Sequence, residues 1–376
     1  MPRNILITGG AGFIGSHLVD FILDNSKHNI TVFDCLDTQV HPVNNKPPEY
    51  LNKNATFIKG TVNDYEKFKD LIKNNDIVFH LAAKVGVGQS MYQVSRYAEN
   101  NILGLANLLD ILVNCSHNVK KMVITSSNTV YGEGKVKCSK CGIIFPKSRS
   151  KTQLNNKGWE LQCPKCGMRV KNLLTDEKTP YNSQSVYALS KQVQEEMSLM
   201  IGKTYGLNIT VLRLFLVYGP RQSPSNPYTG VCANFCTRLL NGKRPIVFED
   251  GLQTRDFVNV KDVCQALFLS MNTQSTNGEV FNVGTGNPIT IKEVAETLAR
   301  KINPNLSPIY NQQYRVGDIR HCVADISKIK NIMGYSPKIP FNEGIEEYID
   351  WIKTQKIFQD NTEKALGELK NKGLMK

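Results

Sequence analysis

The sequence predicts an α/β protein built on a doubly wound parallel sheet, with a smaller second domain and an inserted cysteine module. Three observations lead to this prediction. Short apolar runs alternate with segments of helical periodicity through the first part of the chain. A glycine-rich turn joins the first apolar run to the first helix. Two C-x-x-C-G motifs, both in one short basic stretch, interrupt the alternation.

The elements of the sheet follow in order along the chain. Ile102, Leu105, Leu108, Leu109 and Leu112 have helical spacing and predict an amphipathic helix. Strands separated by helices pair in parallel through right-handed crossovers, which produces a doubly wound sheet. We expect strands at residues 4–8, 30–34, 56–59, 77–81, 121–126 and 208–214, and helices at 15–25, 101–113 and 190–205.

Composition shifts suggest where the domains begin and end. The part after residue 220 has more Pro and Gly between its elements, which indicates a second, smaller domain. The Lys-rich composition of the C-terminal end predicts a solvated helix. We expect a nucleotide-binding domain at 1–220 with 252–283 returning to it, an insertion at 134–172, a substrate domain at 221–251 and 284–353, and a solvated helical tail at 354–376.

Composition also limits the class of protein. The chain is 41% hydrophobic and 21% charged, which excludes a disordered, collagen-like or disulfide-rich mini-protein. No run approaches the roughly 18 uncharged apolar residues of a membrane span. The first residues lack a signal-peptide layout. We therefore expect a cytoplasmic protein with no membrane partner, whose ten cysteines are thiols or metal ligands.

The positive charge is concentrated in one part of the chain. Lys and Arg number 46 against 33 Asp and Glu, a net charge of +13. Residues 134–172 hold ten Lys and Arg against Glu160 alone, which is +9. The rest of the chain is nearly balanced, so the sequence indicates one basic module rather than a basic protein.

The glycine turn indicates a dinucleotide site. Glycines between a strand and a helix allow a sharp turn and a close approach to a pyrophosphate, and the helix N-terminus supplies N–H donors. Asp34 ends the second predicted strand, 19 residues beyond Gly15. A carboxylate there accepts hydrogen bonds from an adenosine ribose and repels a 2′-phosphate, which favours NAD over NADP. The turn consists of Gly9, Gly10, Ala11, Gly12, Phe13, Ile14 and Gly15.

A Ser–Tyr–Lys set provides a candidate general base. Tyr187 and Lys191 are four residues apart on a predicted helix, so they share a face. A phenol with a pKa of about 10 is a poor base at neutral pH, and a neighbouring ammonium favours its ionised form. Ser127 follows the strand predicted at 121–126.

With these residues the chain resembles the extended short-chain dehydrogenase/reductases, in particular their NAD-dependent nucleotide-sugar epimerases and dehydratases. The resemblance runs from about Arg3 to Lys353, excluding the basic module, and implies a Rossmann domain with a C-terminal substrate domain. Besides the glycine turn and the Tyr–Lys pair it includes the motifs at 80–84 (HLAAK), 100–101 (NN), 218–221 (YGPR), 255–258 (RDFV) and 315–318 (RVGD).

The resemblance implies a role for each matching residue. Tyr187 would be the general base for a sugar hydroxyl, Lys191 would lower its pKa and bind the nicotinamide ribose, and Ser127 would bind the reacting oxygen. The implied NAD-binding residues are Gly9, Gly12, Phe13, Ile14, Gly15, Asp34, Asp64, Leu81, Ala82, Ala83, Lys84, Asn101, Tyr187 and Lys191. The implied substrate-binding residues are Lys84, Ser127, Asn128, Tyr187, Phe248, Arg255 and Arg315, with the two arginines on the diphosphate.

Two departures from the family pattern concern the site. Thr61 stands where an acidic residue often contacts adenine, and Asp64 lies just beyond it. The 4,6-dehydratases of the family carry an Asp–Glu pair after the strand-end hydroxyl residue, where this chain has Asn128 and Thr129. Neither side chain serves as a carboxylic acid or base. This replacement disfavours dehydration and favours epimerisation at C4, by transient oxidation to a 4-keto sugar and return of the hydride.

The two cysteine motifs predict a four-cysteine metal site. Cys138, Cys141, Cys163 and Cys166 form two C-x-x-C-G knuckles with 21 residues between them. Paired thiolates on tight turns bind one soft cation tetrahedrally, and structural zinc is the default. Iron in a rubredoxin-like site and two disulfides are the alternatives. The zinc ribbon could fold a long loop, cap the sugar pocket, or bring its lysines to an acidic partner.

The resemblance is greatest to a zinc-ribbon-containing subgroup related to dTDP-L-rhamnose 4-epimerases. The alternatives are a UDP-glucose 4-epimerase, then a 4,6-dehydratase or a 4-ketoreductase. A non-enzymatic alternative is an NAD-binding sensor whose basic ribbon binds nucleic acid. The intact set of Ser127, Tyr187 and Lys191 disfavours this alternative, because a sensor does not need a general base. We expect a nucleotide-sugar substrate and, from the resemblance, a homodimer formed through helices including 101–113 and 190–205.

Overall fold

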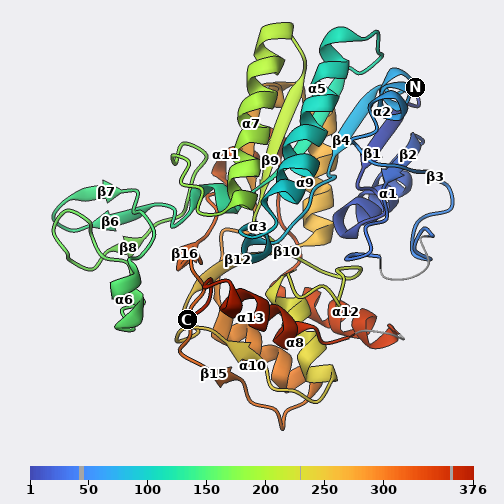
Figure 1. The fold of residues 1–376 in the computed structure, drawn as a ribbon. Helices are drawn as coiled ribbons and strands as arrows, with labels where there is room; N and C mark the ends of the chain where they lie inside the picture. The colour runs from blue at the N-terminus through green and yellow to red at the C-terminus, as the bar shows by residue number, and fades with distance from the viewer. Residues whose placement is uncertain (42–45, 229, 356–358) are drawn as a thin grey trace.

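The computed structural model describes residues 1–41, 46–228, 230–355 and 359–376. Its main feature is a seven-stranded sheet in which all neighbouring strands are parallel (Figure 1). This confirms the predicted doubly wound fold. Across the sheet the strands are β13 (Glu279–Val283), β9 (Ile209–Leu214), β5 (Lys121–Ser127), β4 (Ile77–His80), β1 (Asn4–Thr8), β2 (Asn29–Asp34) and β3 (Thr56–Lys59).

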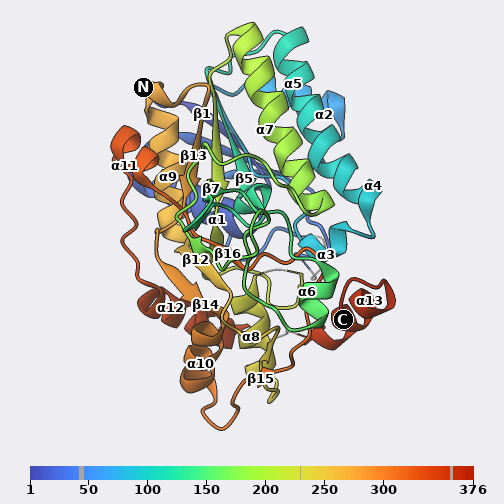
Figure 2. The same ribbon diagram turned by 90° about the vertical axis from the view of Figure 1, so that its left-hand side faces the viewer.

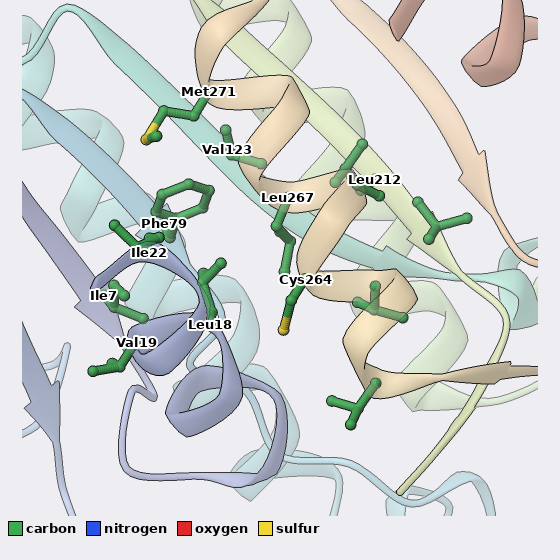
Figure 3. Close-up of a cluster of buried hydrophobic side chains, with 14 of the residues drawn as sticks. Ile7, Leu18, Val19, Ile22, Phe79, Val123, Leu212, Cys264, Leu267 and Met271 are labelled. Carbon is green, nitrogen blue, oxygen red and sulfur yellow. The ribbon is translucent and has the colours of Figure 1, made fainter. Parts of the chain in front are cut away.

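Helices cover both faces of this sheet, which is why its central strands are apolar throughout. On one face, side chains of α1 (Phe13–Asn25) and α9 (Val260–Asn272) pack against alternate strand residues such as Ile7 and Val123 (Figure 3). The other face of the sheet carries a second cluster of buried hydrophobic side chains, which includes Leu6 of β1. The helices there are α2 (Tyr65–Lys73), α5 (Gly104–Asn114) and α7 (Val186–Tyr205).

The three predicted helices start at positions different from those expected, and the helix expected at 15–25 begins at Phe13. The helix expected at 190–205 begins at Val186, because the Ser185 side chain accepts a hydrogen bond from the Ala188 N–H at 3.1 Å and caps it. The helix expected at 101–113 is preceded by a π-helical turn, η1 (Ala98–Leu103). The shorter elements of this domain are α3 (Val87–Ser90), α4 (Val94–Tyr97), η2 (Asn128–Tyr131), η3 (Gln274–Thr276) and α11 (Ser327–Met333).

A second region lies beside the carboxyl ends of the strands. Its core joins Phe235, Phe257, Leu298 and Tyr348 from four different elements. None of the described helices is long and apolar enough to cross a membrane. The elements of this region are β10 (Leu216–Tyr218), α8 (Val231–Leu240), β11 (Ile246–Val247), β12 (Thr254–Asn259), β14 (Pro288–Thr290), α10 (Ile291–Ile302), β15 (Ile309–Tyr310), β16 (His321–Cys322) and α12 (Phe341–Thr354).

The inserted module forms a small antiparallel sheet of its own, which projects away from the seven-stranded sheet (Figure 1). In it β6 (Val136–Cys138) pairs with both β7 (Gly142–Ile144) and β8 (Lys171–Asn172). A short helix, α6 (Lys151–Asn155), follows the first two strands.

The C-terminal end corrects the expectation of a solvated helix at 354–376. Helix α13 (Thr362–Asn371) buries Ala365 and Leu369, which are 5% exposed, while Lys364 and Lys370 face solvent. Ala365 and Leu369 are one helical turn apart, so they form one apolar edge that packs on the body of the protein. The helix lies in front of α8 and below α3 in Figure 1, and both views place it away from the seven-stranded sheet (Figure 2).

Candidate active site

A large cavity opens at the carboxyl ends of β1, β4 and β5, between the seven-stranded sheet and the second region. This is the edge at which doubly wound sheets bind ligands. All the predicted NAD-binding and substrate-binding residues line the cavity except Asp64 and Asn101. Those that line it are Gly9, Gly12, Phe13, Ile14, Gly15, Asp34, Leu81, Ala82, Ala83, Lys84, Ser127, Asn128, Tyr187, Lys191, Phe248, Arg255 and Arg315.

The glycine turn is packed too tightly to accept side chains. Gly9 has φ +69°, and a Cβ there would lie 2.9 Å from the Ala82 nitrogen at the end of β4. A Cβ on Gly15 would lie 2.3 Å from the Gly9 carbonyl oxygen. Gly12 is the N-cap of α1 and has no side chain to occupy the first amides of the helix. The turn therefore presents bare backbone and a helix N-terminus to the cavity, which suits a pyrophosphate.

Asp34 supports this turn from the end of β2. One carboxylate oxygen accepts a hydrogen bond from the Ala11 N–H at 3.1 Å, and the other accepts one from the Leu36 N–H at 2.8 Å. The side chain is 9% exposed and lines the cavity. Its position fits the predicted ribose contact, and the carboxylate also has a local structural task that the sequence did not reveal.

Ser127, Tyr187 and Lys191 come together although 60 residues separate the first two. Ser127 ends β5, and the other two lie in the first turns of α7. Ser90 of α3 fixes the start of α7, because its Oγ accepts a hydrogen bond from the Tyr187 N–H at 3.0 Å. The Lys191 ammonium donates to the Thr125 carbonyl oxygen at 2.8 Å. The three side chains are thus held from the strand end, the helix and a neighbouring short helix.

Burial dominates the electrostatics of this set. Burial raises the pKa of Tyr187, and a hydrogen bond with Ser127 acts in the opposite direction. Burial lowers the pKa of Lys191 to about 8, against the attraction of Glu195. The structure therefore does not show the lowering of the Tyr187 pKa expected from Lys191. The ammonium is hydrogen-bonded to the backbone, and desolvation penalises the charged forms of both groups.

The two predicted diphosphate arginines share one carboxylate. Arg255 lies 3.1 Å and Arg315 2.8 Å from opposite oxygens of Asp318. Burial alone would raise the pKa of Asp318, but the guanidinium groups of Arg315 and Arg255 lower it to about 2. The Arg315 guanidinium also lies 4.9 Å from the ring centre of Phe248. An ionised Asp318 therefore holds both cations at one end of the cavity, beside an aromatic ring.

The inserted module is anchored to this arginine pair. Arg149 is buried between Glu133 at 3.4 Å and Glu249 at 2.9 Å, and it donates to the Asp318 carbonyl oxygen at 3.0 Å. Trp159 packs on Tyr314, next to Arg315. One of the module's positive charges is thus neutralised inside the protein. The module lies against the arginine-bearing segment rather than forming a separate domain.

Two predicted NAD contacts lie outside the cavity. Asp64 is the N-cap of α2, where its side chain accepts a hydrogen bond from the Lys67 N–H at 3.3 Å, and Thr61 and Val62 line the cavity in its place. Asn101 is fully buried. Its side chain accepts a hydrogen bond from the Lys84 N–H at 2.7 Å and donates one to the Ser190 Oγ at 2.9 Å, so it holds these two residues in place behind the cavity wall.

The structure brings the four predicted metal ligands together. Their sulfur atoms all lie within 4.8 Å of one another, and the Sγ atoms of Cys138 and Cys166 are 3.5 Å apart. Zinc bonds of about 2.3 Å separate tetrahedral sulfurs by about 3.8 Å, so the set fits a closed zinc site. Gly142 and Gly167, which follow the knuckles, have φ +78° and +72°. Glycine is needed there to turn each knuckle back.

Two groups of cavity residues were missed by the sequence analysis. Asp37 pairs with Lys84 and with Arg96 beside the predicted ribose end. Burial opposes ionisation of Asp37, but its hydrogen bond from Lys84 helps to lower the pKa to about 2. The second group belongs to the C-terminal end, where apolar residues at helical spacing were a usable signal. Its members are Thr362, Ala365, Leu366, Leu369 and Leu374.

Comparison with known proteins agrees with this geometry. The chain matches the family described as GDP-mannose 4,6 dehydratase over residues 6–147 and 169–348, so the internal gap in the match, residues 148–168, lies wholly within the inserted module. It is 33% identical to a dTDP-L-rhamnose 4-epimerase of Burkholderia thailandensis over 353 residues, which cover 93% of this chain and 95% of that protein.

Solved structures show the same fold. A UDP-glucose 4-epimerase of Thermotoga maritima, solved with UDP-glucose, has a TM-score of 0.77 and 32% identity, and the match covers 93% of this chain and 98% of that one. A UDP-glucuronic acid 4-epimerase of Bacillus cereus, in complex with UDP-glucuronic acid and NAD, has a TM-score of 0.75 and 27% identity over 93% and 99% of the two chains. The chain therefore belongs to the GDP-mannose 4,6-dehydratase family of extended short-chain dehydrogenase/reductases and is an enzyme of the nucleotide-sugar epimerase group.

Proposed function

We propose that this protein is an NAD-dependent nucleotide-sugar C4 epimerase whose substrate is dTDP-L-rhamnose. The observation that carries the reaction type is the cavity, which combines Ser127, Tyr187 and Lys191 with the neutral side chains of Asn128 and Thr129. The substrate proposal is supported by the 33% identity to the Burkholderia thailandensis enzyme. The related UDP-glucose 4-epimerase of Thermotoga maritima makes UDP-glucose the second candidate.

The cavity fits NAD along one side. The bare glycine turn and the N-terminus of α1 suit the pyrophosphate, and Asp34 suits a ribose 2′-hydroxyl. Lys191 lines the same cavity, where it would hold the nicotinamide ribose. When bound, NAD supplies a hydride acceptor for C4 of the sugar and later returns the hydride.

Tyr187 would take the proton of the sugar 4-hydroxyl and give it back after the sugar has turned over. Ser127 would donate a hydrogen bond to the same oxygen, which favours the carbonyl form of the intermediate. Because burial raises the Tyr187 pKa, the phenol is protonated at neutral pH before ligands enter, and because burial lowers the Lys191 pKa to about 8, this ammonium titrates closer to neutrality than a free lysine does. The pKa values of two buried groups of this kind shift strongly when a charge is placed beside them.

Asn128 distinguishes an epimerase from a dehydratase on chemical grounds. Elimination of water across C5 and C6 needs an acid and a base close to those carbons. Asn128 is 5% exposed and lines the cavity directly after Ser127, so an uncharged amide occupies that position. The remaining chemistry is oxidation and reduction at one carbon, which inverts the centre when the keto sugar presents its other face.

The proposal is tested by proton NMR of the purified protein without added cofactor. The protein is incubated with dTDP-L-rhamnose and, separately, with UDP-glucose. We expect a new C4-epimer signal with dTDP-L-rhamnose and a smaller or absent signal with UDP-glucose. A signal only with UDP-glucose would replace the substrate and keep the reaction. Silence with both donors after NAD is added would contradict the proposed function, and a 4-keto-6-deoxy product would identify a dehydratase.

Asp34→Asn is expected to weaken NAD binding about 10-fold and to reduce the preference for NAD over NADP. The amide keeps one oxygen to accept the Ala11 or Leu36 N–H but loses the negative charge that binds the 2′-hydroxyl and repels a 2′-phosphate. Calorimetric titration of the protein freed of nucleotide measures both affinities. Unchanged affinities for both dinucleotides would assign Asp34 to the support of the glycine turn alone.

We further propose that the four-cysteine cluster holds one structural zinc ion. The cluster supplies four sulfur ligands and so leaves zinc no open position for a substrate. Its module would then be folded by the metal, because its own core, formed by Val136, Ile144 and Leu161 with two cysteines, is small.

The protein is also proposed to be a homodimer that buries one face of α5, α7 and the turn before α5. Large apolar side chains on α7 and on the turn before α5 are exposed, which is unusual for a surface that always faces water. The exposed residues are Leu103 of η1 and Leu189 and Met200 of α7.

A further inference from the structure

The C-terminal segment, residues 359–376, forms part of the cavity wall. Thr362, Ala365, Leu366 and Leu369 of α13 line the cavity, as does Leu374 beyond the helix. The apolar edge of α13 therefore packs over the opening between the two domains, next to α3 and α8 (Figure 1). None of these positions belongs to a motif that marks the family in this sequence.

This wall lies at the sugar end of the cavity. A Cβ on Gly88 would lie 2.9 Å from Leu369, so the side chain rests directly on α3. The same short helix holds Ser90, whose Oγ accepts the Tyr187 N–H. Leu369 therefore packs on the short helix that also contacts the backbone of Tyr187, the proposed general base. Val87 and Met91 of the same stretch also line the cavity, so the wall is apolar on both sides.

Polar contacts fix the segment to both domains. Glu368 accepts hydrogen bonds from the Tyr92 hydroxyl at 2.8 Å and the Tyr228 hydroxyl at 2.6 Å, and these two hydroxyls lie 2.6 Å from each other. These two hydrogen bonds are the main cause of the lowered pKa of Glu368. Thr362 accepts a hydrogen bond from Asn234 of α8 at 2.9 Å. The helix is thus held in one position across the cleft.

The last residues pair with the strand-like segment that carries Arg315. The Tyr314 N–H donates to the Lys376 carbonyl at 2.9 Å, the Lys376 N–H donates to the Tyr314 carbonyl at 3.1 Å, and the Val316 N–H donates to the Leu374 carbonyl at 2.9 Å. These three bonds flank Arg315 on both sides. Its backbone position therefore depends on the end of the chain.

We propose that residues 359–376 determine specificity in the substrate site, with two tasks. Leu366 and Leu369 provide an apolar wall for the methyl group of a 6-deoxy sugar, and Leu374–Lys376 position Arg315 for the diphosphate. A C6 hydroxyl or carboxylate against this wall would lose water without gaining a partner, which selects against such sugars. This inference rests on the proposed nucleotide-sugar epimerase function.

The first test compares Leu369→Asn with the wild type on dTDP-L-rhamnose and dTDP-glucose, which differ in the sugar and share the nucleotide. We expect kcat/KM for dTDP-L-rhamnose to fall about 10-fold and the preference over dTDP-glucose to fall by a similar factor. Lys370→Asn, on the solvent side of the same helix, is the matched control and tests the loss of helix propensity. An unchanged preference in Leu369→Asn would overturn the specificity role.

The second test removes only Leu374, Met375 and Lys376 and measures binding of dTDP alone by calorimetry. We expect about 10-fold weaker binding, no further loss when Arg315→Ala is added, and unchanged NAD content. Additive losses, or an unchanged dTDP affinity, would overturn the positioning role. If the wild-type protein turned over neither sugar, the proposed function would fail, whereas this binding test would still decide whether the segment positions Arg315.

Discussion

Tyr187→Phe is expected to reduce turnover of the nucleotide sugar by at least about 1000-fold while the protein keeps its NAD. The substitution removes the single phenolic oxygen that would take and return the proton of the 4-hydroxyl, and proton transfer by a positioned side chain contributes roughly 10²–10⁴-fold. The ring and its contact with Tyr97, at 6.4 Å between centroids, remain. Burial of the aromatic body is therefore preserved, and the fold should be unaffected.

The measurement pairs NMR turnover with the absorbance of bound nucleotide and a thermal melt. Tyr205→Phe is the matched control, because Tyr205 ends the same helix and is 54% exposed. It is expected to behave like the wild type. Turnover by Tyr187→Phe at the wild-type rate would refute the assignment of the base, whereas loss of NAD together with turnover would assign Tyr187 to cofactor binding.

Cys163→Ser is expected to remove the metal ion from the inserted module. Cys163 is 2% exposed, its sulfur lies within 4.8 Å of the other three, and a neutral hydroxyl does not replace a thiolate in a closed four-sulfur site. Because the module has a small core, loss of the metal should unfold it. We expect metal content to fall from about one ion per chain to near zero, and limited proteolysis to cut within residues 134–172.

Elemental analysis of the purified protein measures the metal directly and also separates zinc from iron. Cys115→Ser is the matched control, because Cys115 is half-buried and lies outside the cluster. Retention of one ion per chain in Cys163→Ser would contradict the four-cysteine site. Unfolding of the module should also raise the KM for the nucleotide sugar, since Arg149 and Trp159 contact the segment that carries Arg315.

Sequence alone determined the features that depend on short stretches of chain. The glycine turn, the four-residue spacing of Tyr187 and Lys191, and the two cysteine knuckles each encode a local backbone geometry. Alternating strands and helices then permit few topologies, because parallel pairing needs right-handed crossovers. For that reason the doubly wound class of the sheet followed from the pattern of the chain, whereas the spatial order of the strands and the edge strand β13 came only from the structure.

Tertiary structure decided which side chains face the cavity and which are buried behind it. Asp64 and Asn101 sit close in sequence to cavity residues, yet one caps a helix and the other is enclosed against Lys84 and Ser190. The C-terminal helix was expected in water because its lysines dominate its composition. Its apolar edge is buried only because α3, α8 and the segment around Arg315 meet it from distant parts of the chain. The spacing of apolar residues reveals that a helix has an apolar edge. The surface that covers this edge is determined by packing between segments far apart in sequence.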